Sequence, residues 1–248
     1  MVDLQKLAST FSRDGFVLLD QLWTADETTK IESELDRFIV DCVPGMAKTD
    51  KWFTNGPEGE IKNLGFLNRY DPYFEELSKH SLMQEIATAL LGSKAIFTGH
   101  EYFSRPPHSD AIGPYHQDNG YFFYDPPEAL AFWIPLDDVN EDNGGVAYAK
   151  GSHNAGTLPH EASGIRGFSQ QIVDAENQLK GFPEVFGVLP RGGCAIHHCL
   201  TAHRSGSNIT DRKRRAMVAN YKTTSAKESP FLHDKLKRYL DELKKDSS

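Results

Sequence analysis

Apolar side chains recur at helical spacing through the first ninety residues of the chain. Residues 4–14 form a short amphipathic pattern, and the apolar run at 16–19 predicts a first strand. The next helix is expected over 24–43, because Thr24 is a favourable N-cap and two acidic residues follow it in the first turn. A further helical pattern covers 72–91 and ends at a glycine. This part of the chain is therefore predicted to be mainly helical.

After Gly92 the pattern changes to short runs rich in β-branched and aromatic residues. Turn signals such as Pro106-Pro107 and the Asp-Asn-Gly-Gly sequence at 142–145 separate these runs. Many short strands at this spacing are typical of an antiparallel sandwich or barrel. The strands are expected at 95–103, 129–136, 145–149, 184–189, 192–197 and 215–221.

Three segments do not fit this scheme. Residues 44–65 are rich in turn formers, and we expect them to be irregular. The polar segment 151–181 is long for a connection, so it is either a functional lid or an excursion with a little helix of its own. Residues 228–245 have the charged, amphipathic pattern of a terminal helix.

Length and composition narrow the possible classes of protein. The 248 residues suit one domain, with a helical part at about 1–92 and a β core at about 93–225. The chain has 27 basic and 35 acidic residues and a formal net charge of −8, which argues against nucleic acid or a membrane as partner. Three cysteines favour a reducing compartment, and the start of the chain lacks a signal-peptide pattern, so we expect a cytoplasmic protein. The oligomeric state is not predicted.

The sequence Tyr-His-Gln-Asp-Asn at 115–119 carries the first candidate chemistry. On a strand, residues two apart point to the same face, so His116 and Asp118 would present an imidazole and a carboxylate side by side. Such a pair is a weak signal alone, but with a second histidine it would form the facial triad that holds non-haem Fe(II). The chain offers further histidines throughout. His197 and His198 alternate across one predicted strand, and we interpret them as structural.

Among these histidines His203 has the most suitable surroundings. It follows a predicted strand, and Arg214 comes eleven residues later at the head of the next one. A hairpin would place Arg214 near His203 but deeper in the barrel, where an arginine fork could bind the distal carboxylate of a metal-bound dicarboxylic acid. Ser205 could add a hydroxyl to that carboxylate. A slip of one residue would give this role to Arg215 instead.

Six short motifs follow one another in order along the chain. These motifs are His116-Gln-Asp118, the run from Ala131 to Asp138, Glu-Asp-Asn-Gly-Gly at 141–145, Lys-Gly-Ser-His at 150–153, His203-Arg-Ser205 and Asp-Arg-Lys-Arg-Arg at 211–215. Over about residues 10–222 the series closely resembles the phytanoyl-CoA dioxygenase family of Fe(II)/2-oxoglutarate oxygenases. The resemblance implies a mainly β fold with flanking helices, built on a double-stranded β-helix (jelly-roll, cupin-like) core.

The resemblance also implies roles for individual residues. His116, Asp118 and His203 would be the iron ligands. The cosubstrate 2-oxoglutarate would be held by Arg214 and Ser205, with Trp133 lining its pocket and Arg105 as a further basic residue. By residue type alone, Trp133 would more often belong to the core, and only the resemblance favours the pocket.

The implied reaction consumes O2 and hydroxylates a C–H bond of a small-molecule metabolite while 2-oxoglutarate becomes succinate and CO2. Because halogenases of the family lack the metal carboxylate, the presence of Asp118 favours hydroxylation. Candidate substrate-binding residues are Asn119, Tyr102 and Tyr121, which flank the metal motif. Two alternatives remain at this point. The chain could be a catalytically silent jelly-roll binding protein, or a zinc hydrolase that uses the same three ligands.

Overall fold

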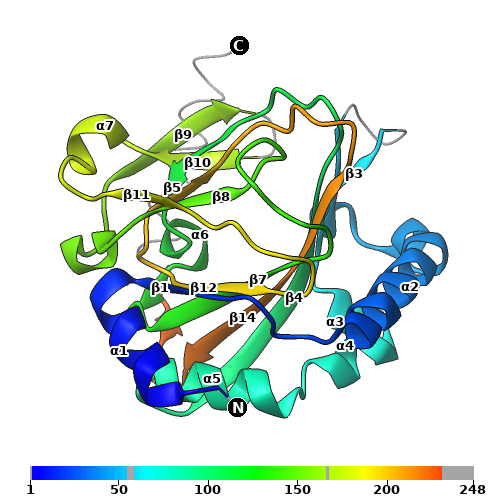
Figure 1. Cartoon of the computed structure of the whole chain (residues 1–248), viewed down its shortest axis with the longest axis horizontal. Coiled ribbons are helices and arrows are strands. Elements are labelled where there is room, and N and C mark those ends of the chain that lie inside the picture. The colour runs from blue at the N-terminus through cyan, green and yellow to red at the C-terminus, as the bar shows by residue number, and fades with distance from the viewer. Residues whose placement is uncertain (1, 55–58, 166–167, 231–248) are drawn as a thin grey trace.

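Antiparallel strands form two facing sheets in the computed structural model, which describes residues 2–54, 59–165 and 168–230 (Figure 1). Within these residues the larger sheet has the strand order β1-β12-β7-β14-β4-β3-β2, and the smaller has the order β11-β8-β13-β5. The described strands are β1 Phe16–Leu19, β2 Lys51–Phe53, β3 Ile61–Gly65, β4 Ala95–Arg105, β5 Gly113–His116, β6 Tyr124–Asp125, β7 Ala129–Pro135, β8 Val146–Ala149, β9 His160–Ile165, β10 Phe168–Ile172, β11 Glu184–Phe186, β12 Cys194–His198, β13 His203–Ser205, β14 Arg214–Thr223 and β15 Lys227–Glu228. The jelly-roll architecture predicted from the sequence is confirmed.

A small apolar core lies between the two sheets. Phe16 of β1 stacks on Tyr148 of β8 with ring centroids 4.7 Å apart, and Val146 and Val218 belong to the same cluster. These residues alternate along their strands with residues that face outward, because successive side chains of a strand point to opposite faces. The alternation determines which side chains can reach the interior of the barrel.

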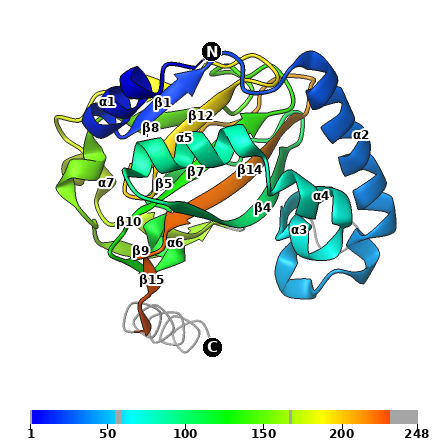
Figure 2. The same cartoon turned by 90° about the horizontal axis from the view of Figure 1, so that it is seen from below.

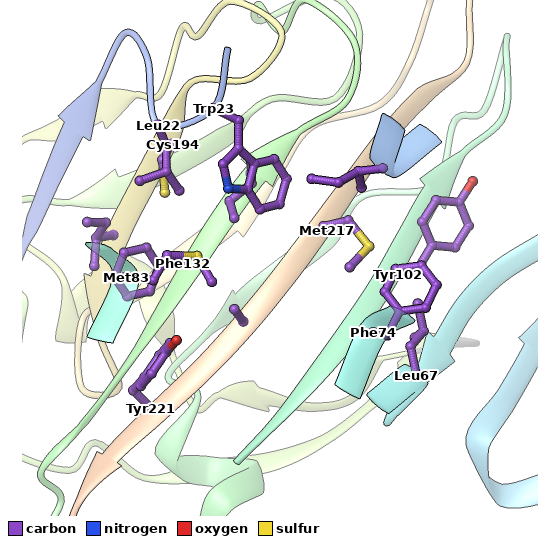
Figure 3. Close-up of a cluster of buried hydrophobic side chains, with 14 of the residues drawn as sticks. Leu22, Trp23, Leu67, Phe74, Met83, Tyr102, Phe132, Cys194, Met217 and Tyr221 are labelled. Carbon is purple, nitrogen blue, oxygen red and sulfur yellow. The ribbon is translucent and has the colours of Figure 1, made fainter. Parts of the chain in front are cut away.

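Helices cover the outer face of the larger sheet (Figure 2). The helices on this side are α1 Leu4–Asp14, α2 Ala25–Asp41, α3 Leu67–Tyr70, α4 Pro72–Leu77 and α5 Ser81–Leu91. Elsewhere, α6 Asn119–Phe122 follows β5 and α7 Ala175–Gln178 lies beside β10. The short 3-10 helices are η1 Val43–Gly45, η2 Lys48–Asp50 and η3 Ser152–Ala155. Met83 of α5, Phe132 of β7 and Met217 of β14 share one core between helices and sheet (Figure 3). Replacing a fully buried side chain such as Phe132 with Ala would cost about 3–5 kcal/mol.

The N-terminal predictions hold closely. The expected helix at 4–14 and strand at 16–19 are present as α1 and β1. Thr24 caps α2 through a capping box, in which its backbone N–H donates to Glu27 Oε2 at 2.7 Å and its hydroxyl accepts from the Glu27 backbone N–H at 3.2 Å. The cap explains why the helix begins where the sequence predicted.

Two predictions in the same region were wrong. The single helix expected over 72–91 is two helices, α4 and α5, because the chain turns at Ser78, whose hydroxyl donates back to the Glu75 carbonyl, and His80 is extended. The supposedly irregular segment 44–65 contains η2 and the hairpin of β2 and β3, which extends the larger sheet through pairing with β4. That pairing depends on tertiary contacts that a polar strand sequence does not reveal.

The remaining segments were predicted in part. Residues 151–181 form an excursion with small elements of its own: η3, the antiparallel pair β9 and β10, and α7. Of the helix expected over 228–245, the first residue belongs to β15 and most of the others lie outside the described residues. In the part of the chain that the structure describes, none of the helices has the length and apolarity needed to cross a membrane.

Candidate metal centre and cosubstrate pocket

Two short neighbouring strands bring three potential metal ligands together. His116 ends β5, His203 begins β13, and the two residues are directly paired in the ladder. Asp118 follows His116 after a single residue, and its Oδ1 lies 3.5 Å from His203 Nε2 and 3.9 Å from His116 Nε2. One ligand atom from each residue lies within 4.8 Å of the other two. This geometry can hold a metal ion.

The position of Asp118 differs from the prediction in one respect. The residue is not on the strand with His116, because β5 ends there and Asp118 adopts a right-handed helical conformation ahead of α6. The backbone N–H groups of Tyr121 and Phe122 donate to its carbonyl at 2.8 and 3.0 Å. A helical turn therefore directs the carboxylate toward the histidines. The sequence had predicted the same direction from the alternation of side chains along a strand.

Gln117, between the two ligands, fixes this turn. Its side-chain amide donates to the carbonyls of Leu200 and Gly156 at 2.7 and 2.9 Å and accepts from the Leu158 N–H at 2.8 Å. The side chain is fully buried, so these hydrogen bonds form away from water. These hydrogen bonds connect the turn that carries Asp118 to Leu200, shortly before β13, and to the segment 151–181.

Both imidazoles are oriented for metal binding. His116 Nδ1 lies 2.9 Å from the Pro114 carbonyl oxygen, and His203 Nδ1 lies 2.9 Å from that of Thr201. Because a carbonyl only accepts, each Nδ1 carries the proton and each Nε2 directs its lone pair toward Asp118. Burial, with the charge of His116, lowers the pKa of His203 to about 3, and burial also lowers the pKa of His116. Both rings are thus neutral near pH 7, the form that binds a metal.

Asp118 remains ionised despite its burial. Burial alone raises the pKa of this carboxyl, but His203, His197 and His116 together hold it well below its usual range. His197 Nε2 lies 3.0 Å from Asp118 Oδ2, and the Tyr148 hydroxyl lies 3.4 Å from His197 Nδ1. The sequence interpretation of His197 as merely structural missed this contact. Alternation along β12 predicts that only one imidazole of the 197–198 pair faces inward, but it does not reveal the contact of that imidazole with Asp118.

Two buried arginines stand beside the metal ligands. Arg105 of β4 and Arg214 of β14 are directly paired in the ladder, 6% and 4% exposed, and neither forms an ion pair with a carboxylate among the described residues. Burial and then the charge of Arg105 lower the pKa of Arg214 to about 9, and burial lowers that of Arg105 to about 10. Both side chains therefore stay cationic near pH 7 and form a site for an anion.

Further contacts shape this anion site. Arg105 Nη2 donates to the Ser205 hydroxyl oxygen at 2.9 Å, and Nη1 donates to the Ala111 carbonyl. The Arg214 guanidinium lies 5.4 Å from the Trp133 ring centroid, within cation–π range. The buried Nε of Arg214 has no hydrogen-bond partner in the described chain. An unpaired donor on a buried guanidinium indicates that an acceptor belongs beside it.

Arg215, the alternative by one residue, faces away from this site. Its Nη2 lies 2.8 Å from Asp137 Oδ1 and 3.0 Å from Glu32 Oε1. The hydrogen bonds with Asp137 raise the pKa of Arg215 further above its ordinary value. Because successive residues of β14 point to opposite faces, only Arg214 is directed into the barrel.

One cavity, with a volume of about 1910 Å³, joins these groups. It is lined by every residue predicted to bind metal or cosubstrate: His116, Asp118, His203, Arg214, Ser205, Trp133 and Arg105. Tyr121, a predicted substrate residue, also lines it. The structure thus brings together residues that lie up to 109 positions apart in the sequence, from Arg105 to Arg214.

The other two predicted substrate residues lie elsewhere. Asn119 is buried and bridges a turn, its side chain accepting from the Tyr124 N–H at 3.0 Å and donating to the Tyr124 carbonyl at 3.1 Å. Tyr102 packs in the core between the larger sheet and the helices (Figure 3). Its neighbour on β4, Glu101, lines the cavity instead, because alternate residues of a strand face opposite sides.

The comparisons with known proteins agree with this geometry. The family model of phytanoyl-CoA dioxygenase (PhyH) matches residues 11–216. The chain belongs to the PhyH family. Together with the triad of two histidines and one aspartate, this membership makes the protein an enzyme, an oxygenase that depends on iron and 2-oxoglutarate.

Similar proteins come from several sources. Phytanoyl-CoA dioxygenase domain-containing protein 1 of Mus musculus is 24% identical over 263 residues, which covers 85% of this chain and 87% of the relative. Ectoine dioxygenase of Stutzerimonas stutzeri (strain A1501) is 26% identical over 254 residues, with coverage of 93% and 80%. The solved structure of the epimerase SnoN in complex with Fe3+, alpha ketoglutarate and nogalamycin RO has a TM-score of 0.74 at 23% identity, with coverage of 92% and 88%.

Proposed function

We propose that this enzyme hydroxylates a C–H bond of a small-molecule metabolite and converts 2-oxoglutarate to succinate and CO2. The observation that carries the proposal is the joint placement of the ionised Asp118, two neutral imidazoles and the Arg105–Arg214 pair around one cavity. Ectoine dioxygenase and the SnoN complex support a small-molecule substrate, since the names of both refer to small compounds.

The ligand set fits an Fe(II) ion. Two neutral nitrogen donors and one carboxylate, contributed from β5, the following turn and β13, form a facial triad with the remaining positions open toward the cavity. Bound iron supplies the oxidative chemistry: with O2 and 2-oxoglutarate, one oxygen atom enters succinate and the other enters the substrate hydroxyl. The protein residues provide position and an environment that excludes bulk water.

The arginine pair fits the distal carboxylate of 2-oxoglutarate. The unpaired Nε of Arg214 can donate to one carboxylate oxygen, with its fork parallel to the anion. The Ser205 oxygen already accepts from Arg105, so its own hydroxyl hydrogen is oriented away from Arg105 and can be donated to the same carboxylate. Trp133, within cation–π range of Arg214, restrains the guanidinium.

Retention of the aspartate favours hydroxylation over halogen transfer. In this chain Asp118 is held by His197 and by the backbone of α6, so the carboxylate occupies the third ligand position. A halide would need that position. The expected product is therefore a substrate hydroxyl group that carries one oxygen atom from O2.

Anaerobic spectroscopy combined with product analysis tests this function. Fe(II) and 2-oxoglutarate added together to the purified protein should give a weak visible charge-transfer band that neither gives alone. Admission of O2 with a metabolite library should then release succinate, and the effective compound should gain one oxygen atom. A band without succinate from any compound would indicate a silent binding protein. Hydrolytic activity that survives without O2 and 2-oxoglutarate would indicate a zinc hydrolase.

A further inference from the structure

The cavity contains a second polar group, which neither metal nor cosubstrate binding uses. Glu101 of β4, Asn63 of β3 and Asn220 of β14 all line it. The three strands are neighbours in the larger sheet, and Val218, two residues from Asn220, is paired with Glu101. The group therefore comes from three adjacent strands and occupies one patch of the cavity wall.

The hydrogen bonds within this group leave two amide oxygens without a partner among the described residues. Asn220 Nδ2 donates to Glu101 Oε1 at 2.9 Å, and the Asn63 side chain is hydrogen-bonded to the same carboxylate. Because a carboxylate accepts, both amides turn their NH2 groups toward it. The Oδ1 atoms of Asn63 and Asn220 are buried and have no hydrogen-bond partner within the described residues. Asn220 as a whole is only 7% exposed.

Buried acceptors without donors are rare in folded proteins and indicate a missing donor. Here the Glu101 carboxyl and the two asparagine amides belong to one patch of the cavity wall, which offers acceptors and, when Glu101 is ionised, a negative charge. A hydroxyl group has one hydrogen to donate, whereas a primary ammonium has three and carries the complementary charge. An anionic group would meet only acceptors at this place.

The group of Glu101, Asn63 and Asn220 lies apart from the anion site formed by Arg105 and Arg214, although β4 and β14 contribute to both. Arg105 and Glu101 are four residues apart on β4 and face the same side, so their Cα atoms are separated by about 13 Å. Burial, and then the charge of Asp118, raise the pKa of Glu101 to about 7, so the group is partly ionised near pH 7 and a cation bound beside it would favour the carboxylate form. The cavity thus has a cationic end for 2-oxoglutarate and an acceptor end that remains for the substrate.

We propose that Glu101, held between the amide groups of Asn63 and Asn220, binds a primary ammonium group of the substrate. The inference rests on the proposed function, since it names the substrate class of the same cavity. Phe103 and Tyr121, which also line the cavity, provide aromatic surface for a cationic or apolar substrate body.

A matched set of small probes tests the assignment. Benzylamine is a cation with three N–H donors, benzyl alcohol is its neutral counterpart, and benzoate is an anion. Their dissociation constants are measured by calorimetry under anaerobic conditions on protein loaded with Fe(II) and 2-oxoglutarate. Wild type should bind benzylamine about 10- to 100-fold more tightly than benzyl alcohol, with benzoate weakest.

Glu101→Gln is the decisive variant, because it keeps the shape and removes the charge. It should lose the preference for benzylamine while retaining the Fe(II)/2-oxoglutarate charge-transfer band. Glu176→Gln on α7, outside the cavity lining, is the matched control and should keep the preference.

Equal affinity of wild type for all three probes, no measurable binding of benzylamine, or an unchanged preference in Glu101→Gln would each overturn the assignment. An unchanged preference would also indicate that Glu101 only supports the fold. Absence of the band in wild type, in contrast, would count against the proposed function, so the two failures are distinguishable.

Discussion

The Nε2 atom of His197 lies 3.0 Å from Oδ2 of Asp118, while Oδ1 of the same carboxylate faces His203 and His116. The two carboxylate oxygens are therefore divided between different tasks. Oδ2 is restrained by an imidazole from β12, and Oδ1 is directed toward the metal position. His197 acts as a positioning residue for the ligand, without being a ligand in the triad.

Replacing His197 by Phe should weaken Fe(II) binding about 10- to 100-fold, because contacts that orient a metal ligand typically contribute that much affinity. The measurement is an anaerobic Fe(II) titration in the presence of 2-oxoglutarate. His198→Phe is the control, since it changes the adjacent imidazole on the other face of β12. Equal losses of affinity in both variants would show that the effect comes from the fold and not from Asp118.

Replacing Arg214 by Met should weaken 2-oxoglutarate binding by about 2–3 kcal/mol, or roughly 30- to 150-fold, because it removes a buried charged donor. Fe(II) affinity should change little. Arg215→Met is the matched control. It removes the ion pair with Asp137 and should reduce stability without changing cosubstrate affinity. If Arg215→Met instead weakened 2-oxoglutarate binding, the assignment of the two arginines would be reversed.

Fe(II) binding should raise the thermal midpoint of unfolding, because the triad links β5 to β13 only in the folded protein. At a free metal concentration of 100 times the dissociation constant, the gain is about 2.7 kcal/mol, or roughly 5–10 °C for a chain of this size. Anaerobic calorimetry with Fe(II) and then with a chelator measures the shift. His203→Ala should show no such shift, and a shift of wild-type size in that variant would place the metal elsewhere.

Acid should destabilise the protein partly through His100. Burial lowers the pKa of His100 in the folded protein to about 3, whereas the unfolded chain takes up a proton near pH 6.5. The unfolded state therefore binds more protons between these values, and the free energy of unfolding falls as the pH drops below 6.5. This one group contributes about 1.4 kcal/mol per pH unit in that window. His100→Leu should reduce the slope by this amount in urea unfolding at pH 6.5 and 5.0, and parallel curves for the two proteins would contradict the assignment.

The sequence could predict residues that come together in one cavity because the identities of these metal and cosubstrate candidates carry the information. His116, Asp118 and His203 stand in an order and at spacings that few arrangements satisfy, and all three reach one cavity. From the sequence, Arg214 could be preferred to Arg215 as the cosubstrate arginine only because of its position in the motif at 211–215. In the structure the difference follows from strand alternation, which directs one guanidinium inward and the other to Asp137.

The substrate end could not be predicted in the same way. Tyr102 was predicted because aromatic residues near a metal motif suggest a pocket wall, and Glu101 was not considered, yet Glu101 lines the cavity while Tyr102 packs in the core on the opposite side of β4. The sequence shows that neighbouring residues of β4 face opposite sides, but it does not show which side faces the interior of the barrel. Had Arg105 been used to set the inward face, Glu101 would have followed, since it lies four residues before Arg105 on the same face. Asn63 comes from a strand that only tertiary pairing reveals.

The direct pairing of Arg105 with Arg214 has a consequence for how the barrel itself is stabilised. Two like charges in the same layer of neighbouring strands repel each other, and burial weakens the screening of that repulsion by water. In the proposed cosubstrate site, a dianion beside them would act as an internal counterion for the wall of the barrel. The cosubstrate is then also a structural component, and its conversion to succinate, a dianion of similar length, would leave the wall neutralised until the product is exchanged for the next cosubstrate molecule.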